Sequence, residues 1–549
     1  MSLDHVTVLI PAAGRVASET IGSAAIGCPA MIPVGGRPVI YWTLRYLRSL
    51  GLRKFVIAVA ERGLYVERYV DYLTDGDCDV QFIKPSRDGG LGGTVSELCQ
   101  TVTTRSALVV LGDTFFRFQD AAVLSADEPV VLTHPVDEAF RWCTADVDSH
   151  GYVSALHDKE PNFGSAPAAL IGVYFAPQAE ALREASTAAV SASPARTELS
   201  QILLNLNRVD KIRAVPAATW QDCGNPDLQT ASHQKLLESR AFNHLHVDPL
   251  FGIIRKQSER GEKLIDEINY LRLLPAELSA LFPRLIDYSI AADAPWMRME
   301  YFGFPTLAEV FLYERPSGNT WSQIFGRLLE IQCDCFMKWT RNVEPESLRS
   351  MYLGKTQQRL ATLQGPPELL KLVRHAGPIQ VNGRVLSNLP DLWDNIEQRI
   401  AMISRNGHGS IIHGDFCLSN ILYDWRSRTC KLIDPRGSFG SNGIYGDPRY
   451  DVAKLYHSVY GLYDFIVQDL FRLDTSSDDI RLEIGSGKHH EDARLRFESI
   501  YFPTFDRDEI LLLTALLFIS MPPLHYDHPR RQIAMYLRGL QLLNELFTK

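Results

Sequence analysis

The stretch that decides the fold of the second half is His413-Gly414-Asp415-Phe416-Cys417-Leu418-Ser419-Asn420, continued by Ile433-Asp434-Pro435-Arg436-Gly437. Residues 421–423 and 430–433 are predicted as two short strands joined by a turn. That arrangement brings Asp415, Asn420 and Asp434 together at strand ends. Phosphoryl transfer needs a carboxylate that orients and deprotonates the acceptor hydroxyl, and oxygen ligands for Mg²⁺. We assign Asp415 the first role, and Asn420 with Asp434 the second.

The size and composition of the chain indicate a globular protein of several domains. Its 549 residues exceed one ordinary core, so two large domains or more are expected. A hydrophobic content of 46% and a charged content of 22% are typical of globular proteins. The net charge of -9 argues against a surface that coats nucleic acid, and leaves small anionic metabolites as ligands.

Cysteine spacing and hydropathy favour a cytoplasmic protein. The nine cysteines show no Cys-x-x-Cys pair and no zinc-site spacing, which favours a reducing compartment. The N-terminus lacks the pattern of a signal peptide. The most apolar stretch, Ile510 to Met521, is too short to span a bilayer and is predicted as a core helix. We therefore expect small-molecule substrates, no nucleic acid and no membrane insertion, while the oligomeric state stays open.

Strand and helix patterns alternate in the first half of the chain. Strands are predicted at 6–10, 54–60, 80–83 and 107–111, and helices at 40–50, 64–73 and 93–101. This alternation predicts a doubly wound α/β sheet with right-handed crossovers. In such sheets ligands bind at the carboxyl ends of the strands.

Three groups of residues stand at those strand ends. They are Ala13, Gly14 and Arg15 after the first strand, Gly92, Gly93 and Thr94 in a glycine-rich turn, and Asp113 after the fourth strand. The glycine-rich turn can bring backbone N–H groups to a base or phosphate, or it is an ordinary surface loop. A carboxylate such as that of Asp113 is a natural Mg²⁺ ligand.

Four ordered motifs in this half resemble those of the sugar-phosphate and phosphocholine nucleotidyltransferases. They are residues 11–15, 29–40, 111–113 and 220–226, and the resemblance spans about 6–240. It implies that the first loop wraps a nucleoside triphosphate, which Arg15 meets, and that Asp113 and Asp222 hold Mg²⁺. It also implies that Lys159 contacts the acceptor phosphate, and that Ala13, Gly14, Gly92, Gly93 and Thr94 surround the nucleotide.

The chemistry implied is attack of a phosphate oxygen on the α-phosphorus with loss of pyrophosphate, which needs cations around an anionic transition state. The sequence departs from the family where Ala30 replaces a lysine that helps to neutralise the triphosphate. This departure is consistent with a slow enzyme, with a substitute cation such as Arg37 or Lys84, or with a domain that binds a nucleotide without catalysis. The three alternatives stay open.

The second half begins with the pattern of a small β-rich lobe. A hairpin is predicted from 242 to 256, followed by a helix at 262–273 that carries Glu267. A strand lysine, here Lys256, held by a helix glutamate fixes the charge that meets the nucleotide phosphates in kinases. The alternative is a solvated surface pair. Two more strands are predicted at 283–290 and 296–301, and Glu300 begins a hinge, 300–303, where an adenine can bind. Helices predicted at 306–312, 321–339 and 366–375 begin a larger lobe.

The opening stretch resembles the catalytic core of the aminoglycoside phosphotransferase and choline kinase family, whose fold is similar to protein kinases. The resemblance covers about 242 to the C-terminus. It implies that His413 orients the catalytic loop and that Asp451 braces it. Tyr456, Tyr460 and Tyr463 recur at helical spacing; we interpret them as core, with a pocket for a quaternary ammonium as the alternative. The polar segment 483–492, with His489 and His490, is predicted as a solvated loop.

Together the patterns and the two resemblances predict a nucleotidyltransferase-like domain with a doubly wound, mixed α/β sheet, 1–240. They also predict a two-lobed kinase-like α+β domain, 241–549, with a small lobe at 241–303 and a helical lobe at 304–549. We expect a bifunctional enzyme that phosphorylates a small amino alcohol or sugar and couples a phosphomonoester to a nucleotide. Such activated donors serve surface polysaccharide synthesis. Mg²⁺, ATP and a second nucleoside triphosphate, with CTP as a candidate, are the expected cofactor and substrates. The alternatives are a kinase with a degenerate nucleotide-binding domain and a non-catalytic assembly protein.

Overall fold

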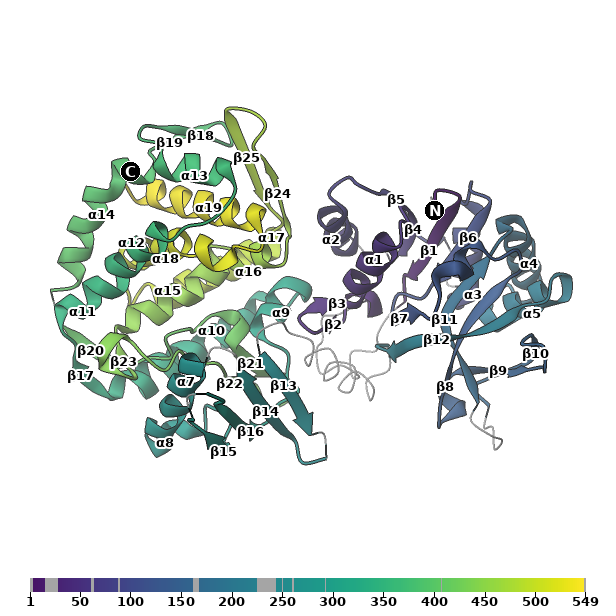
Figure 1. The fold of residues 1–549 in the computed structure, drawn as a ribbon, viewed down its shortest axis with the longest axis horizontal. Coiled ribbons are helices and arrows are strands. Elements are labelled where there is room, and N and C mark those ends of the chain that lie inside the picture. Colours follow the sequence, from purple (N-terminus) through teal and green to yellow (C-terminus); the bar gives the residue numbers. More distant parts are fainter. Residues whose placement is uncertain are drawn as a thin grey trace. The chain divides into compact units, whose positions relative to one another are not determined.

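The computed structural model describes residues 3–14, 28–60, 64–86, 89–160, 167–224, 243–248, 250–258, 261–291, 293–405 and 407–547. The chain divides into two compact units, Met1–Leu236 and Leu237–Lys549 (Figure 1). Residues 226–240, whose sequence pattern predicts a helix, lie outside the described residues. No helix within the described ranges is both long and apolar enough to cross a membrane.

The first unit is built on a mixed sheet with strand order β5-β4-β1-β6-β11-β8-β12-β7. These strands are β1 (Val6–Ala12), β4 (Lys54–Val59), β5 (Asp79–Ile83), β6 (Ser106–Val110), β7 (Thr114–Phe118), β8 (Val130–Pro135), β11 (Ala168–Ala176) and β12 (Arg213–Asp222). Strand β1 is parallel to β4 and β6, whereas β11 is antiparallel to β6 and β8. The pair β9 (Cys143–Val147) and β10 (Val153–Asp158) branches from β11. The predicted mixed α/β sheet is confirmed.

Helices cover both faces of this sheet (Figure 1). They are α1 (Val39–Ser49), α2 (Leu64–Thr74), α3 (Gly90–Gln100), α4 (Ala179–Ala192) and α5 (Leu199–Val209). The last three share one apolar core with the sheet, in which Val95, Leu182 and Ile202 pack with Leu9 and Val109. Right-handed crossovers place α1 and α2 on the opposite face, because β4 and β5 lie on one side of β1 and β6 on the other.

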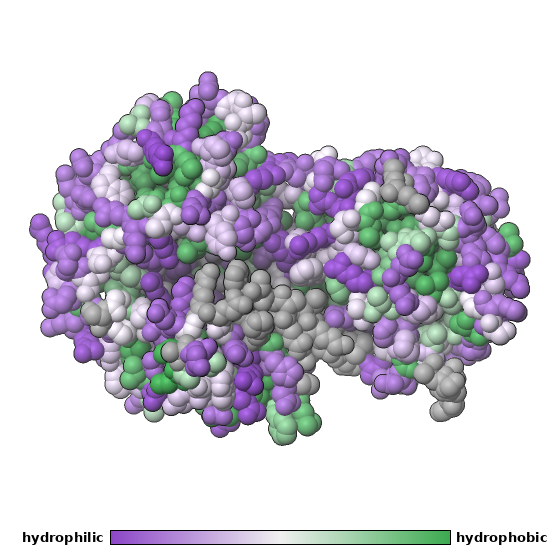
Figure 2. Space-filling model, in the orientation of Figure 1, coloured by the Kyte–Doolittle hydropathy of each residue, from purple (hydrophilic) through white to green (hydrophobic). Residues whose placement is uncertain are grey.

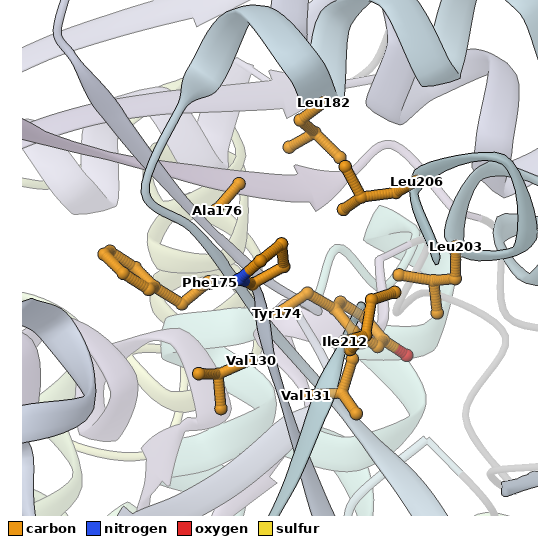
Figure 3. Close-up of a pocket in the computed structure, with 10 residues that line it drawn as sticks. Val130, Val131, Tyr174, Phe175, Ala176, Leu182, Leu203, Leu206 and Ile212 are labelled. Atoms are coloured by element: carbon orange, nitrogen blue, oxygen red, sulfur yellow. The ribbon is translucent and has the colours of Figure 1, made fainter. Parts of the chain in front are cut away.

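A small gap lies in the core between α4, α5 and the strands β8 and β11 (Figure 3). Its volume is about 10 Å³, and Val130, Val131, Leu182, Leu206 and Ile212 are among the side chains around it. A space of this size holds at most one water, and apolar walls give a water no hydrogen-bond partners. The gap is therefore a feature of packing and not a ligand site.

The second unit begins with a small sheet of order β13-β14-β16-β15. Its strands are β13 (Asn243–Asp248), β14 (Ile253–Ser258), β15 (Leu285–Ser289) and β16 (Trp296–Glu300), and the helix α7 (Gly261–Leu273) packs on them. Ile254 and Met297 from the sheet share an apolar core with Leu264 and Ile268 from α7. Figure 2 shows apolar atoms at the turn between β13 and β14, where Leu250 and Phe251 are exposed.

The rest of the second unit is mainly helical. Its helices are α9 (Leu307–Tyr313), α10 (Gly318–Glu330), α11 (Pro345–Arg349), α12 (Lys355–Ala361), α13 (Pro367–Arg374), α14 (Leu389–Ile403), α15 (Pro448–Val459), α16 (Tyr463–Val467), α17 (Lys488–Tyr501), α18 (Arg507–Ser520) and α19 (Pro529–Phe547). Every residue of α18 from Ile510 to Ser520 is buried, so the predicted core helix is confirmed. The short strands β20 (His408–Ile411), β21 (Ile421–Asp424) and β22 (Thr429–Leu432) frame the deciding stretch.

Two segments differ from the sequence-based prediction. The segment 483–492 is not a loop, because β25 (Asp479–Ile484) ends in it and α17 begins at Lys488. Its polar residues face solvent, while His490 is buried, and the ring Nδ1 of His490 accepts the N–H of Gly487 at 2.8 Å to start the helix. The glycine-rich turn is shorter than expected, because α3 starts at Gly90 and already contains Gly92, Gly93 and Thr94.

Candidate active sites in the two units

A cavity of about 280 Å³ in the first unit gathers three of the predicted site residues. Asp113, Asp222 and Lys159 all line it. The other lining residues that matter for its chemistry are Arg141, Trp142, Tyr174, Glu198 and Trp220. The cavity therefore combines four carboxylates, those of Asp113, Asp158, Glu198 and Asp222, and two cations with aromatic walls.

Backbone contacts hold the two aspartates together. Asp113 follows β6, and Asp222 is the last residue of β12. The N–H of Cys223 donates to the carbonyl oxygen of Asp113 at 2.9 Å, which joins the two strand ends. A Cβ atom at Gly224 would overlap the carboxylate of Asp113, so only glycine leaves room for this approach.

The electrostatics of this pair suit a divalent cation. Burial, and then the charge of Asp222, raise the pKa of Asp113 to about 6. The indole N–H of Trp142 and the N–H of Gly224 donate to the two carboxylate oxygens of Asp222 at 2.8 and 2.9 Å and fix its orientation. The described residues contain no cluster of three or more His, Cys, Asp or Glu side chains placed for a metal. A bound Mg²⁺ would hence draw its remaining ligands from phosphate oxygens and water.

Lys159 stands directly after β10 in a left-handed conformation, with a φ of 57°. Its N–H donates to the carbonyl oxygen of Trp142 at 3.1 Å. A non-glycine residue in this conformation is uncommon and is often found at functional sites. Arg141 also lines the cavity, but we did not predict it from the sequence. No local pattern indicates where the side chain of a single arginine between two strands points.

The structure does not bring the predicted nucleotide-loop residues into this cavity. None of Ala13, Gly14, Gly92, Gly93 and Thr94 is among the residues that line it, and Arg15 lies outside the described residues. The N–H of Gly92 donates to the carbonyl oxygen of Thr197 at 2.9 Å. A Cβ atom at position 92 would come within 2.7 Å of the same oxygen, so close packing explains this glycine.

Ala30 is fully buried beside the ends of β1 and β6. Its methyl group lies 3.2 Å from the place where a Cβ atom of Gly112 would stand. Of the two candidate substitutes for the missing lysine, Arg37 stacks its guanidinium over the ring of Tyr41 at 4.2 Å. Position 30 thus faces the strand ends but brings no charge there.

In the second unit, Lys256 of β14 bridges two carboxylates. Its Nζ lies 2.7 and 3.0 Å from the carboxylate oxygens of Glu267 on α7, and 2.6 Å from Oδ1 of Asp434. Lys256 and Glu267 are 5% and 6% exposed. These exposures exclude the alternative of a solvated surface pair. The bridge joins the small sheet to the loop that follows β22.

Asp415 is held in its ionised form. Its Oδ1 lies 2.7 Å from Nζ of Lys454, and its Oδ2 accepts from Nδ2 of Asn420 at 3.1 Å. Burial alone would raise the pKa of Asp415, but the charge and hydrogen bond of Lys454, together with His413 and Asn420, outweigh burial and lower the pKa. Because the amide nitrogen of Asn420 faces Asp415, its carbonyl oxygen is the atom available as a metal ligand.

His413 and Asp451 shape the loop that carries Asp415. The N–H groups of His413 and Gly414 donate to the two carboxylate oxygens of Asp451 at 2.7 and 2.8 Å. Burial lowers the pKa of His413 to about 4, so its ring is neutral near neutral pH. Its Nδ1 accepts the N–H of Asp415 at 3.3 Å, and the ring stacks on Phe282. This geometry suits an orienting group and not a base.

Asp434 adopts a left-handed conformation, with a φ of 55°, and Gly437 follows with a φ of 80°. A Cβ atom at Gly437 would overlap the backbone of Asp266 on α7. The turn after β22 is therefore pressed against α7, and it aims Asp434 at Lys256. Backbone strain of this kind is concentrated at functional sites.

The remaining predicted residues have other partners. Glu300 ends β16, and its Oε2 accepts the N–H of Arg284 at 3.0 Å. Tyr456 is fully buried, and its hydroxyl donates to Glu498 at 2.6 Å, which confirms the core interpretation for this residue. Tyr463 stacks on the ring of His457.

A group of basic residues next to Asp415 was missed from the sequence. We call Lys355, Arg359, Arg436 and Tyr450 the basic cluster. Nζ of Lys355 lies 3.0 Å from the hydroxyl of Tyr450, and Nη1 of Arg436 lies 3.3 Å from the same oxygen. Lys355 and Arg359 are four residues apart on α12, and Tyr450 and Lys454 are four residues apart on α15. This spacing places each pair on one helix face and is the sequence signal that could have indicated the cluster.

Comparisons with known proteins bear mainly on the first unit. No model of a known protein family matches the chain. A glucose-1-phosphate thymidylyltransferase of Streptomyces antibioticus is 26% identical over 206 residues, which are 36% of this chain and 56% of that relative. The chain thus spans about half the length of this relative. The N-terminal half is therefore similar in sequence to nucleotidyltransferases, in agreement with the prediction from its motifs.

Solved structures with some similarity include HddC from Yersinia pseudotuberculosis, at 18% identity and a TM-score of 0.35, covering 42% of this chain and 98% of that one. A putative glucose-1-phosphate thymidylyltransferase from Bacillus anthracis has 17% identity and a TM-score of 0.37. The match covers 43% of this chain and 97% of that one. The kinase-like nature of the second half stays a prediction.

Proposed function

We propose that the protein is a bifunctional enzyme in which residues 241–549 phosphorylate a small hydroxyl compound and residues 1–240 couple a phosphomonoester to a nucleotide. The observation that carries the proposal is the bridge from Lys256 to Glu267 and Asp434 together with the ionised Asp415. A buried lysine between two carboxylates and a separate aspartate on a braced loop match the needs of phosphoryl transfer from ATP.

In the kinase reaction, an acceptor hydroxyl oxygen attacks the γ-phosphorus of ATP, the bond to the bridging oxygen breaks, and ADP leaves. Asp415 orients the hydroxyl and takes its proton. Lys256 meets the nucleotide phosphates, and Glu267 holds it in place. Asn420 and Asp434 would hold Mg²⁺, which supplies positive charge to the phosphates when bound.

In the nucleotidyl transfer, an oxygen of the phosphomonoester attacks the α-phosphorus of a nucleoside triphosphate and pyrophosphate leaves. Lys159 and Arg141 face the same cavity as Asp113 and Asp222 and are suited to bind the acceptor phosphate. The two aspartates would hold Mg²⁺, which neutralises the triphosphate when bound. The product would be an activated donor of the kind used in surface polysaccharide synthesis.

The experiment is phosphorus NMR of the full chain with ATP, CTP, UTP or dTTP and candidate acceptors. We expect ADP formation that Asp415→Asn abolishes, and pyrophosphate release that Asp113→Asn abolishes, each without loss of the other activity. Loss of both activities in either variant would contradict two separate sites.

A second candidate is a kinase whose first unit binds a nucleotide without catalysis, and the buried Ala30 favours it. Under this alternative no pair of triphosphate and phosphomonoester releases pyrophosphate, while Asp415-dependent ADP formation persists.

A further inference from the structure

Positive charge without matching carboxylates is concentrated beside Asp415. Lys355 and Arg359 stand one turn apart on α12, and Tyr450 and Lys454 stand one turn apart on α15. The bond from Lys355 to the hydroxyl of Tyr450 brings these two helix faces together. Arg436, from the turn after Asp434, adds its guanidinium to the same hydroxyl.

The nearby carboxylates are already engaged. Asp415 pairs with Lys454, and Asp451 accepts the two N–H groups of the loop. Asp447 binds Arg449 at 2.7 Å and the hydroxyl of Tyr352 at 2.9 Å.

Consequently, within the part of the chain that the structure describes, no carboxylate forms an ion pair with Lys355, Arg359 or Arg436. Nη1 of Arg359 donates instead to the carbonyl and hydroxyl oxygens of Ser520, at 3.2 and 3.3 Å. All three cations are half-buried, and charges that are partly removed from water are normally paired.

The electrostatics agree with an excess of positive charge. Burial, and then the charges of Arg436 and Arg359, lower the pKa of Lys355 to about 8 in spite of Tyr450. Burial would raise the pKa of Tyr450, but Lys355, Lys454 and Arg436 lower it to about 7. The cluster thus favours negative charge on the phenol oxygen of Tyr450.

We propose that the basic cluster binds an anionic group of the phosphate acceptor, and that the acceptor is a hydroxyl compound that already carries a phosphate monoester. Lys355 and Arg436 contact one hydroxyl, and Arg359 stands one turn from Lys355 on α12. These three cations match a dianion better than a single carboxylate, and they disfavour choline or another amino alcohol. This inference rests on the proposed kinase activity and specifies its substrate class. The transfer itself is unchanged, since a free hydroxyl of the acceptor attacks the γ-phosphorus, its proton passes to Asp415 and ADP leaves.

Inorganic phosphate tests the binding site without any turnover. Calorimetric titration of the full chain, saturated with Mg²⁺ and a non-hydrolysable ATP analogue, is expected to detect phosphate binding. Lys355→Met and Arg436→Met should weaken it by at least about tenfold, since each removes a charge-assisted hydrogen bond. Lys355→Arg should retain most of the affinity, which separates loss of charge from loss of fold.

One matched variant serves as the control. Arg384→Met removes an exposed cation on β19 (Arg384–Leu386) and should leave the phosphate affinity unchanged. Lys159→Met removes a cation of the proposed phosphate site in the first unit, so it should abolish any phosphate binding there and leave the binding that depends on Lys355. Competition between phosphate and the ATP analogue, or equal affinity in Lys355→Met, would overturn the inference, because the cluster would then serve the nucleotide or no ligand.

A panel of acceptors tests the substrate class. Transfer from radiolabelled ATP is compared for glucose 6-phosphate, glucuronate, glucose and choline. Transfer to the phosphate ester above the others, lost in Lys355→Met, is the expected result. A preference for glucuronate would show that the cluster recognises a carboxylate and would contradict the inference of a phosphate monoester. A preference for glucose or choline would also overturn the inference, because neither carries an anionic group. Absence of transfer to every compound counts against the kinase proposal, while the phosphate titration still decides whether the cluster binds an anion.

Discussion

Replacing Asp451 tests how the loop around Asp415 is held. Asp451 is 1% exposed, and each of its carboxylate oxygens accepts one backbone N–H, from His413 and Gly414. Asp451→Asn keeps one acceptor and turns a donor NH₂ toward the other N–H. One buried N–H then loses its partner, which costs about 1–3 kcal/mol. Asp451→Ala leaves both without a partner, so its cost is about twice as large.

The local readout is hydrogen exchange of the peptides that contain residues 411–416, followed by mass spectrometry. Each loss of about 1.4 kcal/mol of local stability speeds exchange about tenfold where exchange follows local opening. We expect faster exchange in Asp451→Asn and faster still in Asp451→Ala. The rate of ADP formation should fall in the same order, because the loop positions Asp415.

The matched control is Asp394→Asn on the exposed side of α14, which also removes one carboxylate charge from the second unit. Its exchange at residues 411–416 should equal that of the unchanged protein. Equal exchange in Asp451→Asn and in the control would refute the assignment of Asp451 as the brace of the loop.

Three further predictions follow from the two sites. Asp415→Asn is expected to lower the rate of ADP formation about 10²–10⁴-fold with little change in ATP affinity, measured by steady-state kinetics and calorimetry. Because the pKa of Asp113 rises from 3.8 to about 6, its contribution to stability is present below about pH 4 and is lost as the pH rises through about 6. Mg²⁺ should therefore raise the melting temperature at about pH 8 and not at about pH 5, and Asp113→Asn should remove this difference. Gly437→Ala, at a φ of 80° against the backbone of Asp266, should cost about 2 kcal/mol or more in urea unfolding followed by tryptophan fluorescence.

Residues fixed by local patterns were predictable from the sequence. Lys256 and Glu267 belong to a strand and the next helix, so a few residues of chain decide that they meet. Asp113 and Asp222 are far apart in the chain, and the motifs around them predicted that both face one site.

Contacts between distant helices were not predictable in the same way. The basic cluster combines α12, α15 and the turn after β22, and each of its residues taken alone looks like an ordinary surface cation or core tyrosine. The helix α17 was misassigned because its exposed face makes the local sequence polar, while the burial of His490 depends on a carbonyl of α9. Tertiary context determines both features, and a single sequence does not contain it in a local pattern.

The two sites differ in the charged side chains that they offer to a substrate. In the first unit, Asp113, Asp222, Lys159 and Arg141 line one cavity, so under the proposed function a metal and a phosphate can be bound in it together. Beside Asp415, no carboxylate among the residues that the structure describes forms an ion pair with a cation of the basic cluster, so under the proposed function the acceptor brings the negative charge. Under the proposed function both units then act on phosphomonoesters. The kinase adds a second phosphate to a compound that enters with one, and the nucleotidyltransferase can use the new phosphate while the first remains as a recognition group.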